Sequence, residues 1–165
     1  MNTWFSIKAK ADSKSGNDAE VLIFDEIGGW GIRAKDFIQS LKATKSKRPL
    51  VRINSPGGSV FDGIAIANYL RGLDATVQID GLAASIAGII ALAGKEVRIA
   101  ENGFFMIHNP WGVAVGDAEE LAAQSELLSK LEDTLAADYS RKSGKSVAEV
   151  KQWMSEETWF TAAEA

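Results

Sequence analysis

Short apolar runs of strand length alternate with segments of helical spacing through the first 110 residues of the chain. The strands that we expect are residues 3–10 at a sheet edge, 20–27, 50–54, 75–79, 96–99 and 104–107, and the helices are 32–41, 60–73 and one beginning near residue 84. Within 60–73, the helix-spaced apolar residues are Ile64, Ala67, Tyr69 and Leu70, and residues 11–19 are polar, as in a loop. Strands that alternate with helices favour parallel pairing and right-handed crossovers. The sequence therefore predicts a layered α/β fold.

Composition excludes several classes of function. The 165 residues include no cysteine and one histidine, which excludes a thiol nucleophile, an iron–sulfur cluster, a disulfide framework and a multi-histidine metal site. A net charge of -4 argues against nucleic-acid binding, which needs many cations facing phosphates. The most apolar stretch, residues 82–93, is shorter than the roughly 20 residues that cross a bilayer. We therefore expect no metal, no cofactor, no nucleic-acid partner and no membrane partner.

Beyond residue 110 the pattern becomes helical. Asp117 and Glu120 have the spacing of a capping box, and an apolar stripe follows as far as Gly144. The stripe consists of Leu121, Leu128, Leu131, Leu135 and Tyr139. Such a long helix either folds back on its own core or projects as an arm that packs against another subunit.

Two later pairs, Ser146 with Glu149 and Thr161 with Glu164, have the spacing of helix starts. The chain stops one residue after Glu164, and a helix cannot nucleate without a following turn. We expect either that a C-terminal element is missing or that another chain completes it.

The segment G-L-A-A-S-I-A-G at 81–88 joins an expected strand to an apolar helix. Ser85 falls at the junction, with Ala83 and Ala87 on either side, and small neighbours suit a sharp strand–nucleophile–helix elbow. The segment differs from the G-x-S-x-G pattern. The alternative is a serine that caps a buried helix.

Two glycines follow another expected strand in Ser55-Pro56-Gly57-Gly58. Glycines at such a junction let main-chain N–H groups point outward, as an oxyanion hole requires. The lysine and hydroxyl residue of a phosphate-binding loop are absent at the required spacing. A plain tight turn is the alternative.

His108 ends an apolar strand, where the chain turns at Asn109-Pro110. A serine nucleophile needs a base, and an imidazole supplies one. The alternative is a histidine that a backbone carbonyl satisfies. A carboxylate would orient the ring, and spacing alone leaves Asp80, Glu156 and Glu157 open as candidates.

Four stretches together resemble the ClpP family of self-compartmentalising serine peptidases. They are I-N-S-P-G-G at 53–58, G-L-A-A-S-I-A-G at 81–88, M-I-H-N-P at 106–110 and F-T-A-A-E-A at 160–165, in the family's order. The E-T-W-F wording at 157–160 and the short N-terminal half are most similar to the phage- and prophage-encoded branch, some of whose members act in head maturation.

The resemblance implies a role for each matching residue. It implies Ser85 as the nucleophile, His108 as the base, Gly58 and Ile86 as the oxyanion amides, and Ser59, Val60, Pro110 and Trp111 as the lining of a groove for an extended peptide. Glu157 stands where the family has aspartate. The extra methylene shifts the carboxylate, although glutamate serves in some hydrolase triads.

The resemblance also implies the architecture and the partners. The family fold is a stack of ββα units with a projecting arm helix, in a homo-oligomer of one ring or stacked rings. The single peptidase domain would comprise a strand and loop at 1–19, an α/β core at 20–110, an arm at 111–145 and a truncated part at 146–165. Family members act on protein substrates in the cytoplasm with a AAA+ unfoldase docked through N-terminal loops, which residues 1–19 do not resemble.

Three functions remain as hypotheses. The first is a serine endopeptidase that processes phage capsid or scaffold proteins or unfolded chains. The second is a catalytically silent shell or scaffold subunit with the same fold. The third is a crotonase-like acyl-CoA enzyme, which would need a nucleotide site that no basic cluster near Gly57-Gly58 supports.

Overall fold

The computed structural model describes residues 5–9 and 17–165. The chain divides into two compact units, one of Met1–Met106 with Trp159–Ala165 and the other of Ile107–Thr158.

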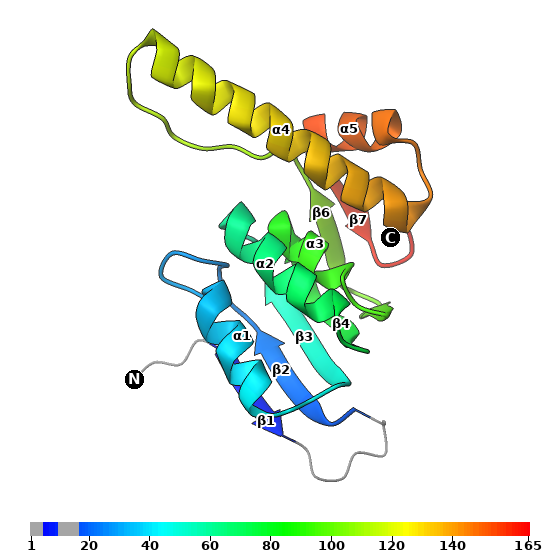
Figure 1. Ribbon diagram of the computed structural model, residues 1–165. Helices are drawn as coiled ribbons and strands as arrows, with labels where there is room; N and C mark the ends of the chain where they lie inside the picture. The colour runs from blue at the N-terminus through cyan, green and yellow to red at the C-terminus, as the bar shows by residue number, and fades with distance from the viewer. Residues whose placement is uncertain (1–4, 10–16) are drawn as a thin grey trace. The chain divides into compact units, whose positions relative to one another are not determined.

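A mixed sheet forms the centre of the first unit (Figure 1). Its strands are β1 (Phe5–Ala9), β2 (Ala19–Ile23), β3 (Pro49–Ser55), β4 (Thr76–Ala84), β5 (Glu96–Ile99), β6 (Phe104–Ile107) and β7 (Thr158–Thr161). The order is β1-β2-β3-β4-β6-β7, and β5 also pairs with β4. β1 is antiparallel to β2, whereas β2, β3 and β4 run parallel, as do β5 and β6 beside β4. The α/β prediction is therefore confirmed.

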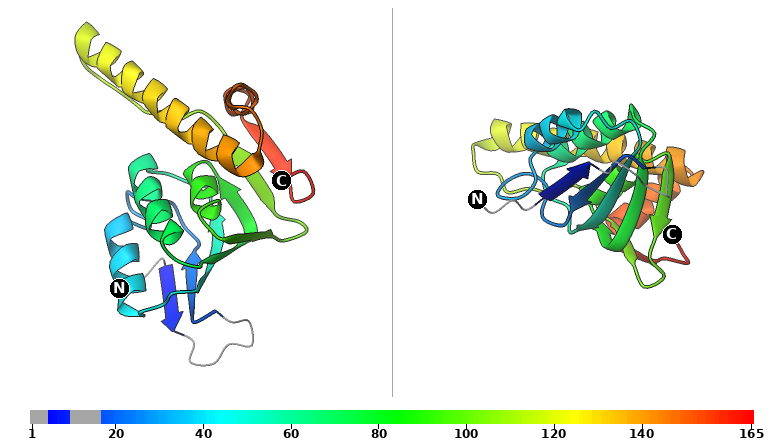
Figure 2. Two further views of the ribbon diagram at one scale, coloured as in Figure 1. Left: turned by 45° about the vertical axis from the view of Figure 1, so that its right-hand side comes forward. Right: turned by 90° about the horizontal axis from the view of Figure 1, so that it is seen from below.

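Three helices lie on one face of this sheet: α1 (Ala34–Ala43), α2 (Val60–Arg71) and α3 (Ile86–Ala91) (Figures 1 and 2). Alternate strand residues point into the core below them, including Val21, Ile53 and Val77, which are fully buried. Arg52 lies between the buried residues Val51 and Ile53 of β3. It pairs with Asp80, with both nitrogen–oxygen distances at 2.7 Å. Period-two alternation thus divides an apolar face from a charged one.

Several predicted strand boundaries are wrong, because backbone pairing with other segments decides where these strands begin and end. β2 begins at Ala19 and ends at Ile23, not at residue 27, because Ile27 forms an isolated bridge with Gly58 instead. β4 runs through Gly81 to Ala84 because its first half pairs with β5 and its second half with β6. The edge strand is confirmed over β1, while residues 3, 4 and 10–16 of the predicted strand and loop lie outside the described residues.

The buried face of α2 includes two of the expected residues, Ala67 and Leu70, but not the other two. The helix buries Gly63, Ile66, Ala67 and Leu70, whereas Ile64 and Tyr69 are half-buried. A Cβ on Gly63 would lie 2.1 Å from Cγ1 of Ile86. Glycine at position 63 therefore lets α2 approach α3 closely on the buried face.

The second unit consists mainly of α4 (Ala118–Ser143) and α5 (Val147–Ser155). The predicted capping box is confirmed, because Asp117 accepts N–H bonds from Glu119 and Glu120 at 3.0 Å, and Glu120 accepts the Asp117 N–H at 2.9 Å. Ser146 caps α5 as predicted. The residues that α4 buries, Leu135, Ala136 and Tyr139, all lie in its C-terminal half. No helix in the described parts of the chain has the length and apolar character to span a membrane.

The predicted helix start at Thr161 is wrong. Thr161 is the last residue of β7. Its N–H and hydroxyl do donate to Glu164, at 2.9 and 2.7 Å, and these bonds lower the pKa of that carboxyl. Ala165 adds a single N–H bond to the Thr161 carbonyl at 3.0 Å. The Thr161–Glu164 pair therefore stabilises a single turn that follows β7, not the start of a helix.

We expect the stability of the first unit to depend on Asp18 in acid. Burial opposes ionisation of Asp18, but the Ser46 hydroxyl and the N–H groups of Lys47 and Arg48 outweigh it and lower the carboxyl's pKa below 3.8. A lowered folded-state pKa stabilises the protein above the unfolded value and loses this effect as pH falls through the folded value. Asp18→Asn should cost about 1 kcal/mol at pH 7 in urea unfolding.

The difference between wild type and Asp18→Asn should shrink below about pH 3.8, as the wild-type carboxyl becomes protonated. Glu101→Gln, at an exposed turn, serves as the control and should leave the profile unchanged. An equal difference at pH 7 and pH 2 would contradict this account.

Candidate active site

Ser85 occupies a sharp junction between β4 and α3. It follows Ala84, the last residue of β4, and its backbone has φ 56° and ψ −129°. A positive φ is strained for any residue with a side chain, and such strain persists where surrounding bonds enforce it. The Ser85 N–H donates to the Met106 carbonyl at 2.9 Å, which holds the elbow against β6.

The side chain of Ser85 does not serve as a helix cap. Although it precedes the first residue of α3, it makes no capping hydrogen bond to that helix. Ala83 and Ala87, on either side of it, are fully buried. Small buried neighbours and a positive φ at a strand–helix junction are the features of a nucleophile elbow.

The Ser55–Gly58 turn packs directly against this elbow. A Cβ on Gly57 would lie 2.7 Å from both the Ser85 Cβ and the Ala84 carbonyl oxygen, and 3.2 Å from the Ile86 nitrogen. Only glycine permits this approach, at a φ of 96°. Two segments that are far apart in the sequence therefore meet at Ser85.

Backbone pairing sets the direction of the Gly58 N–H. The Ile27 N–H donates to the Gly57 carbonyl at 2.7 Å, and the Ser59 N–H donates to the Ile27 carbonyl at 2.7 Å. In a trans peptide the C=O and the following N–H point in opposite directions. Because the Gly57 carbonyl faces Ile27, the Gly58 N–H points away from Ile27.

The Ile86 N–H is the second main-chain donor beside Ser85. Ile86 is the first residue of α3, and the first N–H groups of a helix have no acceptor within it. The close approach of Gly57 to the Ile86 nitrogen places the two segments that carry these donors side by side. Two outward amides next to a serine can stabilise an oxyanion.

His108 and Glu157 both belong to the second unit. Asn109, directly after His108, donates its N–H to the Met154 carbonyl at 3.0 Å. Glu157 donates its own N–H to the same carbonyl at 3.3 Å. One carbonyl near the C-terminal end of α5 therefore accepts N–H bonds both from the residue after His108 and from Glu157.

The other two candidate carboxylates have partners elsewhere. Asp80 forms a two-bond ion pair with Arg52, which engages both of its oxygens. Glu156 accepts a hydrogen bond from the Gln152 side chain at 3.0 Å. The structure therefore engages Asp80 and Glu156 with Arg52 and Gln152.

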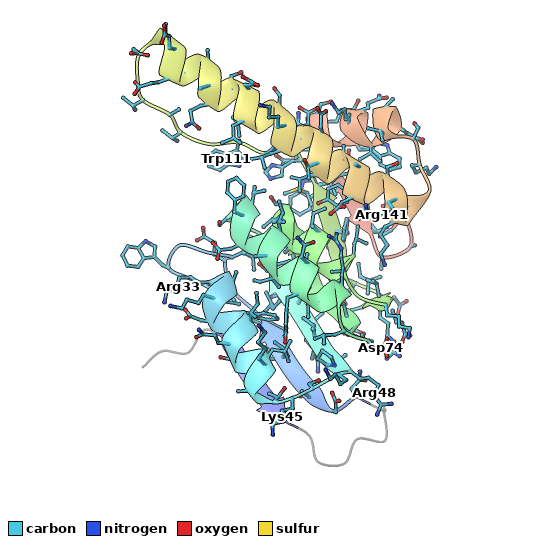
Figure 3. The ribbon with its side chains drawn as sticks, viewed as in Figure 1. Arg33, Lys45, Arg48, Asp74, Trp111 and Arg141 are labelled. Carbon is cyan, nitrogen blue, oxygen red and sulfur yellow. The ribbon has the colours of Figure 1, made fainter. Side chains whose placement is uncertain are left out.

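The predicted groove residues divide between the units. In the first unit, the Ser59 hydroxyl donates to Asp62 at 2.9 Å and caps α2, and Val60 is the first residue of that helix. In the second, Pro110 is half-buried and Trp111 is 74% exposed, at the start of the segment that leads to α4 (Figure 3). Exposure leaves the Trp111 ring available to a ligand.

Sequence reasoning missed the residues that hold the turn. Ile27 is predicted to end a strand, yet its N–H bonds to the Gly57 carbonyl and its carbonyl accepts the Ser59 N–H. The glycines alone carry the predicted role of the Ser55–Gly58 turn, yet the buried Ser55 hydroxyl bonds both to the Gly57 N–H within the turn and to the Asp25 carbonyl outside it. The serine before Pro-Gly-Gly is the available signal, but one of its two partners, Asp25, lies 30 residues away.

Gly57→Ala should destabilise the first unit. The new methyl would meet Ser85 and Ala84 at 2.7 Å and force alanine to adopt a φ of 96°. We expect a loss of about 2 kcal/mol or more in urea unfolding. Gly112→Ala is the matched control, since nothing lies within 4 Å of its added Cβ. Equal stability of the two variants would show that the close approach is not needed.

Comparison with known proteins identifies a family. The Clp protease family model matches residues 17–165. Similar proteins include ATP-dependent Clp protease proteolytic subunit 1 of Leifsonia xyli subsp. xyli, 35% identical over 131 residues (76% of this chain, 66% of the relative), and of Protochlamydia amoebophila, 33% over 132 residues (76% and 64%). The Porphyromonas gingivalis proteolytic subunit is 34% identical over 119 residues (70% and 54%). The chain thus spans less than two thirds of the length of these relatives. The family model matches most of the chain, and the mixed α/β sheet is consistent with it. The chain therefore belongs to the Clp protease family.

Proposed function

We propose that this chain is a serine endopeptidase that cleaves peptide bonds inside a self-assembled oligomer. The observation that carries the proposal is Ser85 on a strained strand–helix elbow, beside two segments that present main-chain N–H groups. Membership of the Clp protease family supports it, as does the wording of the relatives' names. Strain of this kind is retained where it serves function.

In the proposed reaction, the Ser85 hydroxyl attacks the carbonyl carbon of the scissile peptide. His108 takes the hydroxyl proton during attack and gives it to the leaving amine, which leaves an acyl-enzyme. Water, activated by His108 in the same way, then hydrolyses the ester and restores the serine. The Gly58 and Ile86 amides stabilise the negative oxygen in both tetrahedral intermediates.

Two backbone contacts support the roles of His108 and Glu157. The Met106 carbonyl, which accepts the Ser85 N–H, lies two residues before His108 in the chain. The Met154 carbonyl accepts N–H bonds from Asn109 and Glu157. Glu157 is proposed to orient the imidazole and to stabilise its cation, with one methylene more than the aspartate of the family.

Ser59, Val60, Pro110 and Trp111 are proposed to line the peptide groove. The hydroxyl, N–H and carbonyl of Ser59 bond to Asp62, Ile27 and Gly63, so Ser59 would provide a fixed wall rather than hydrogen bonds to substrate. Val60 begins α2, where N–H groups have no helical acceptor and can pair with an extended peptide.

The long helix α4 is proposed to pack against other copies of the chain in a ring or in stacked rings. Leu121 and Leu127, near its N-terminal end, are 45% and 39% exposed, and contiguous exposed apolar surface marks sites of protein–protein contact. Sedimentation velocity at micromolar concentration should reveal an oligomer. A monomer alone would contradict this part of the proposal.

The biological setting is proposed from the sequence resemblance. The substrate class is phage capsid or scaffold protein, or unfolded chains, in the cytoplasm of a bacterial host. A AAA+ unfoldase is a separate question, because residues 1–19 do not resemble the family's docking loops. If such a partner delivers the substrate, ATPase and ATP accelerate the degradation of a folded protein but not of a short peptide.

Hydrolysis of a fluorogenic peptide and of casein tests the proposed function. Both should be cleaved, and a fluorophosphonate should abolish the activity. A silent shell subunit would instead assemble without cleaving either substrate and without reacting with the fluorophosphonate. That result, obtained with folded and assembled protein, would overturn the proposal.

A further inference from the structure

Ser55 is fully buried at the end of β3, directly before the Pro56-Gly57-Gly58 turn. Its hydroxyl donates to the Asp25 carbonyl at 2.6 Å and accepts the Gly57 N–H at 3.2 Å. A buried donor or acceptor that loses its partner is costly. Ser55 therefore ties the turn after β3 to the segment that follows β2.

The bonds of Ser55 act on the peptide that precedes Gly58. Ser55 holds the Gly57 N–H, and Ile27 holds the Gly57 carbonyl at 2.7 Å. With both ends of Gly57 fixed, the Gly58 N–H keeps its direction away from Ile27. If the peptide between Gly57 and Gly58 flipped by 180°, the Gly58 N–H would point towards Ile27. It would then no longer point away from Ile27, as it does in the structure.

The turn would not hold this peptide by its own sequence. Gly57 and Gly58 have φ values of 96° and 138°, a region that glycine enters and leaves freely. Such freedom admits several turn conformations of similar energy. A fixed orientation therefore depends on the side-chain and backbone bonds that surround the turn.

We propose that Ser55 is a positioning residue for the oxyanion hole, acting through the Gly57 N–H to keep the Gly58 N–H directed at the oxygen that becomes negative during attack by Ser85. This inference rests on the proposed function. Ser55 itself does not touch substrate. It should therefore influence the chemical step and leave substrate binding unchanged.

The test compares Ser55→Ala, Ser55→Thr and wild type in two assays. One measures the second-order rate constant for fluorophosphonate labelling of Ser85, and the other measures kcat and KM for a p-nitrophenyl ester. Loss of a direct oxyanion donor costs about 10²–10³ in kcat, so Ser55→Ala should cost about tenfold or more, with KM nearly unchanged. Ser55→Thr, which keeps the hydroxyl, should recover most of the rate.

Ser46→Ala is the matched control. Ser46 is also a buried serine, 7% exposed, whose hydroxyl donates to Asp18 at the opposite end of β3. Its loss should lower the urea midpoint as Ser55→Ala does, while the labelling rate stays at the wild-type value. If Ser55→Ala does not fold, Ser55→Cys supplies a side chain of similar shape with a weak hydrogen-bonding thiol, and it should also label slowly.

The outcomes separate this inference from the function on which it rests. Absence of labelling in folded wild type would overturn the proposed function and the role of Ser55 with it. Labelled wild type together with a folded Ser55→Ala or Ser55→Cys that reacts at the wild-type rate would overturn the role of Ser55 alone. Equal slowing by Ser46→Ala would also overturn it, because the effect would then follow stability.

Discussion

Ser85→Ala should remove peptidase activity and lower turnover by about 10⁴-fold or more, since single replacements in a catalytic serine unit have effects of that size. The reason is the loss of the proposed nucleophile on the elbow between β4 and α3. Fold and assembly should persist, because alanine lacks only the hydroxyl and Ser85 makes no capping bond to α3. Peptide hydrolysis, normalised to folded protein by circular dichroism, measures the effect.

Ser129→Ala is the control for removing a hydroxyl. Ser129 lies on α4, and its hydroxyl donates to the Ser125 carbonyl at 3.1 Å. Its activity should equal that of wild type. If Ser85→Ala retained the wild-type rate, the cleavage would have to use another residue or a contaminating peptidase.

His108→Ala should be almost as damaging as Ser85→Ala. The chain has one histidine, so no other imidazole can accept the serine proton. We expect turnover to fall by about 10³-fold or more, because residues of a catalytic unit act together. Added imidazole should restore part of the activity of His108→Ala and none of that of Ser85→Ala. Unchanged activity in His108→Ala would exclude the proposed base.

The same assay ranks the three candidate carboxylates. Glu157→Gln should lower kcat strongly, because an amide cannot stabilise the imidazolium. Glu156→Gln and Asp80→Asn should lower it little, since those side chains already bond to Gln152 and Arg52. Asp80→Asn should instead reduce stability. A larger kcat effect at Asp80 than at Glu157 would reassign the third member.

Local patterns predicted the parts of the fold that depend on local structure. β5 and β6 have the predicted bounds, because turns enclose both short segments. The Asp117 capping box needs only residues within four positions, and it forms as expected. In contrast, β4 is longer than its apolar run because two different strands pair with it in succession. Pairing partners distant in sequence are invisible to a local pattern.

The candidate site shows the same division. Residue types and order indicated Ser85 and Gly58, but the positive φ of Ser85 follows from its bond to Met106 and from the packing of Gly57. Thr161 had a capping pattern, yet strand pairing prevailed over the helix start. The clamp by Ile27 and Ser55 depends on contacts across about 30 residues. Such contacts become evident only when the chain is folded.

The central claim is that Ser85 is the nucleophile of a hydrolase, and tandem mass spectrometry of the fluorophosphonate-treated wild-type protein tests it most directly. The account predicts one modified site, with the phosphonyl group on the Ser85 side chain. Modification at a different residue, or no adduct on folded and assembled protein, would contradict it.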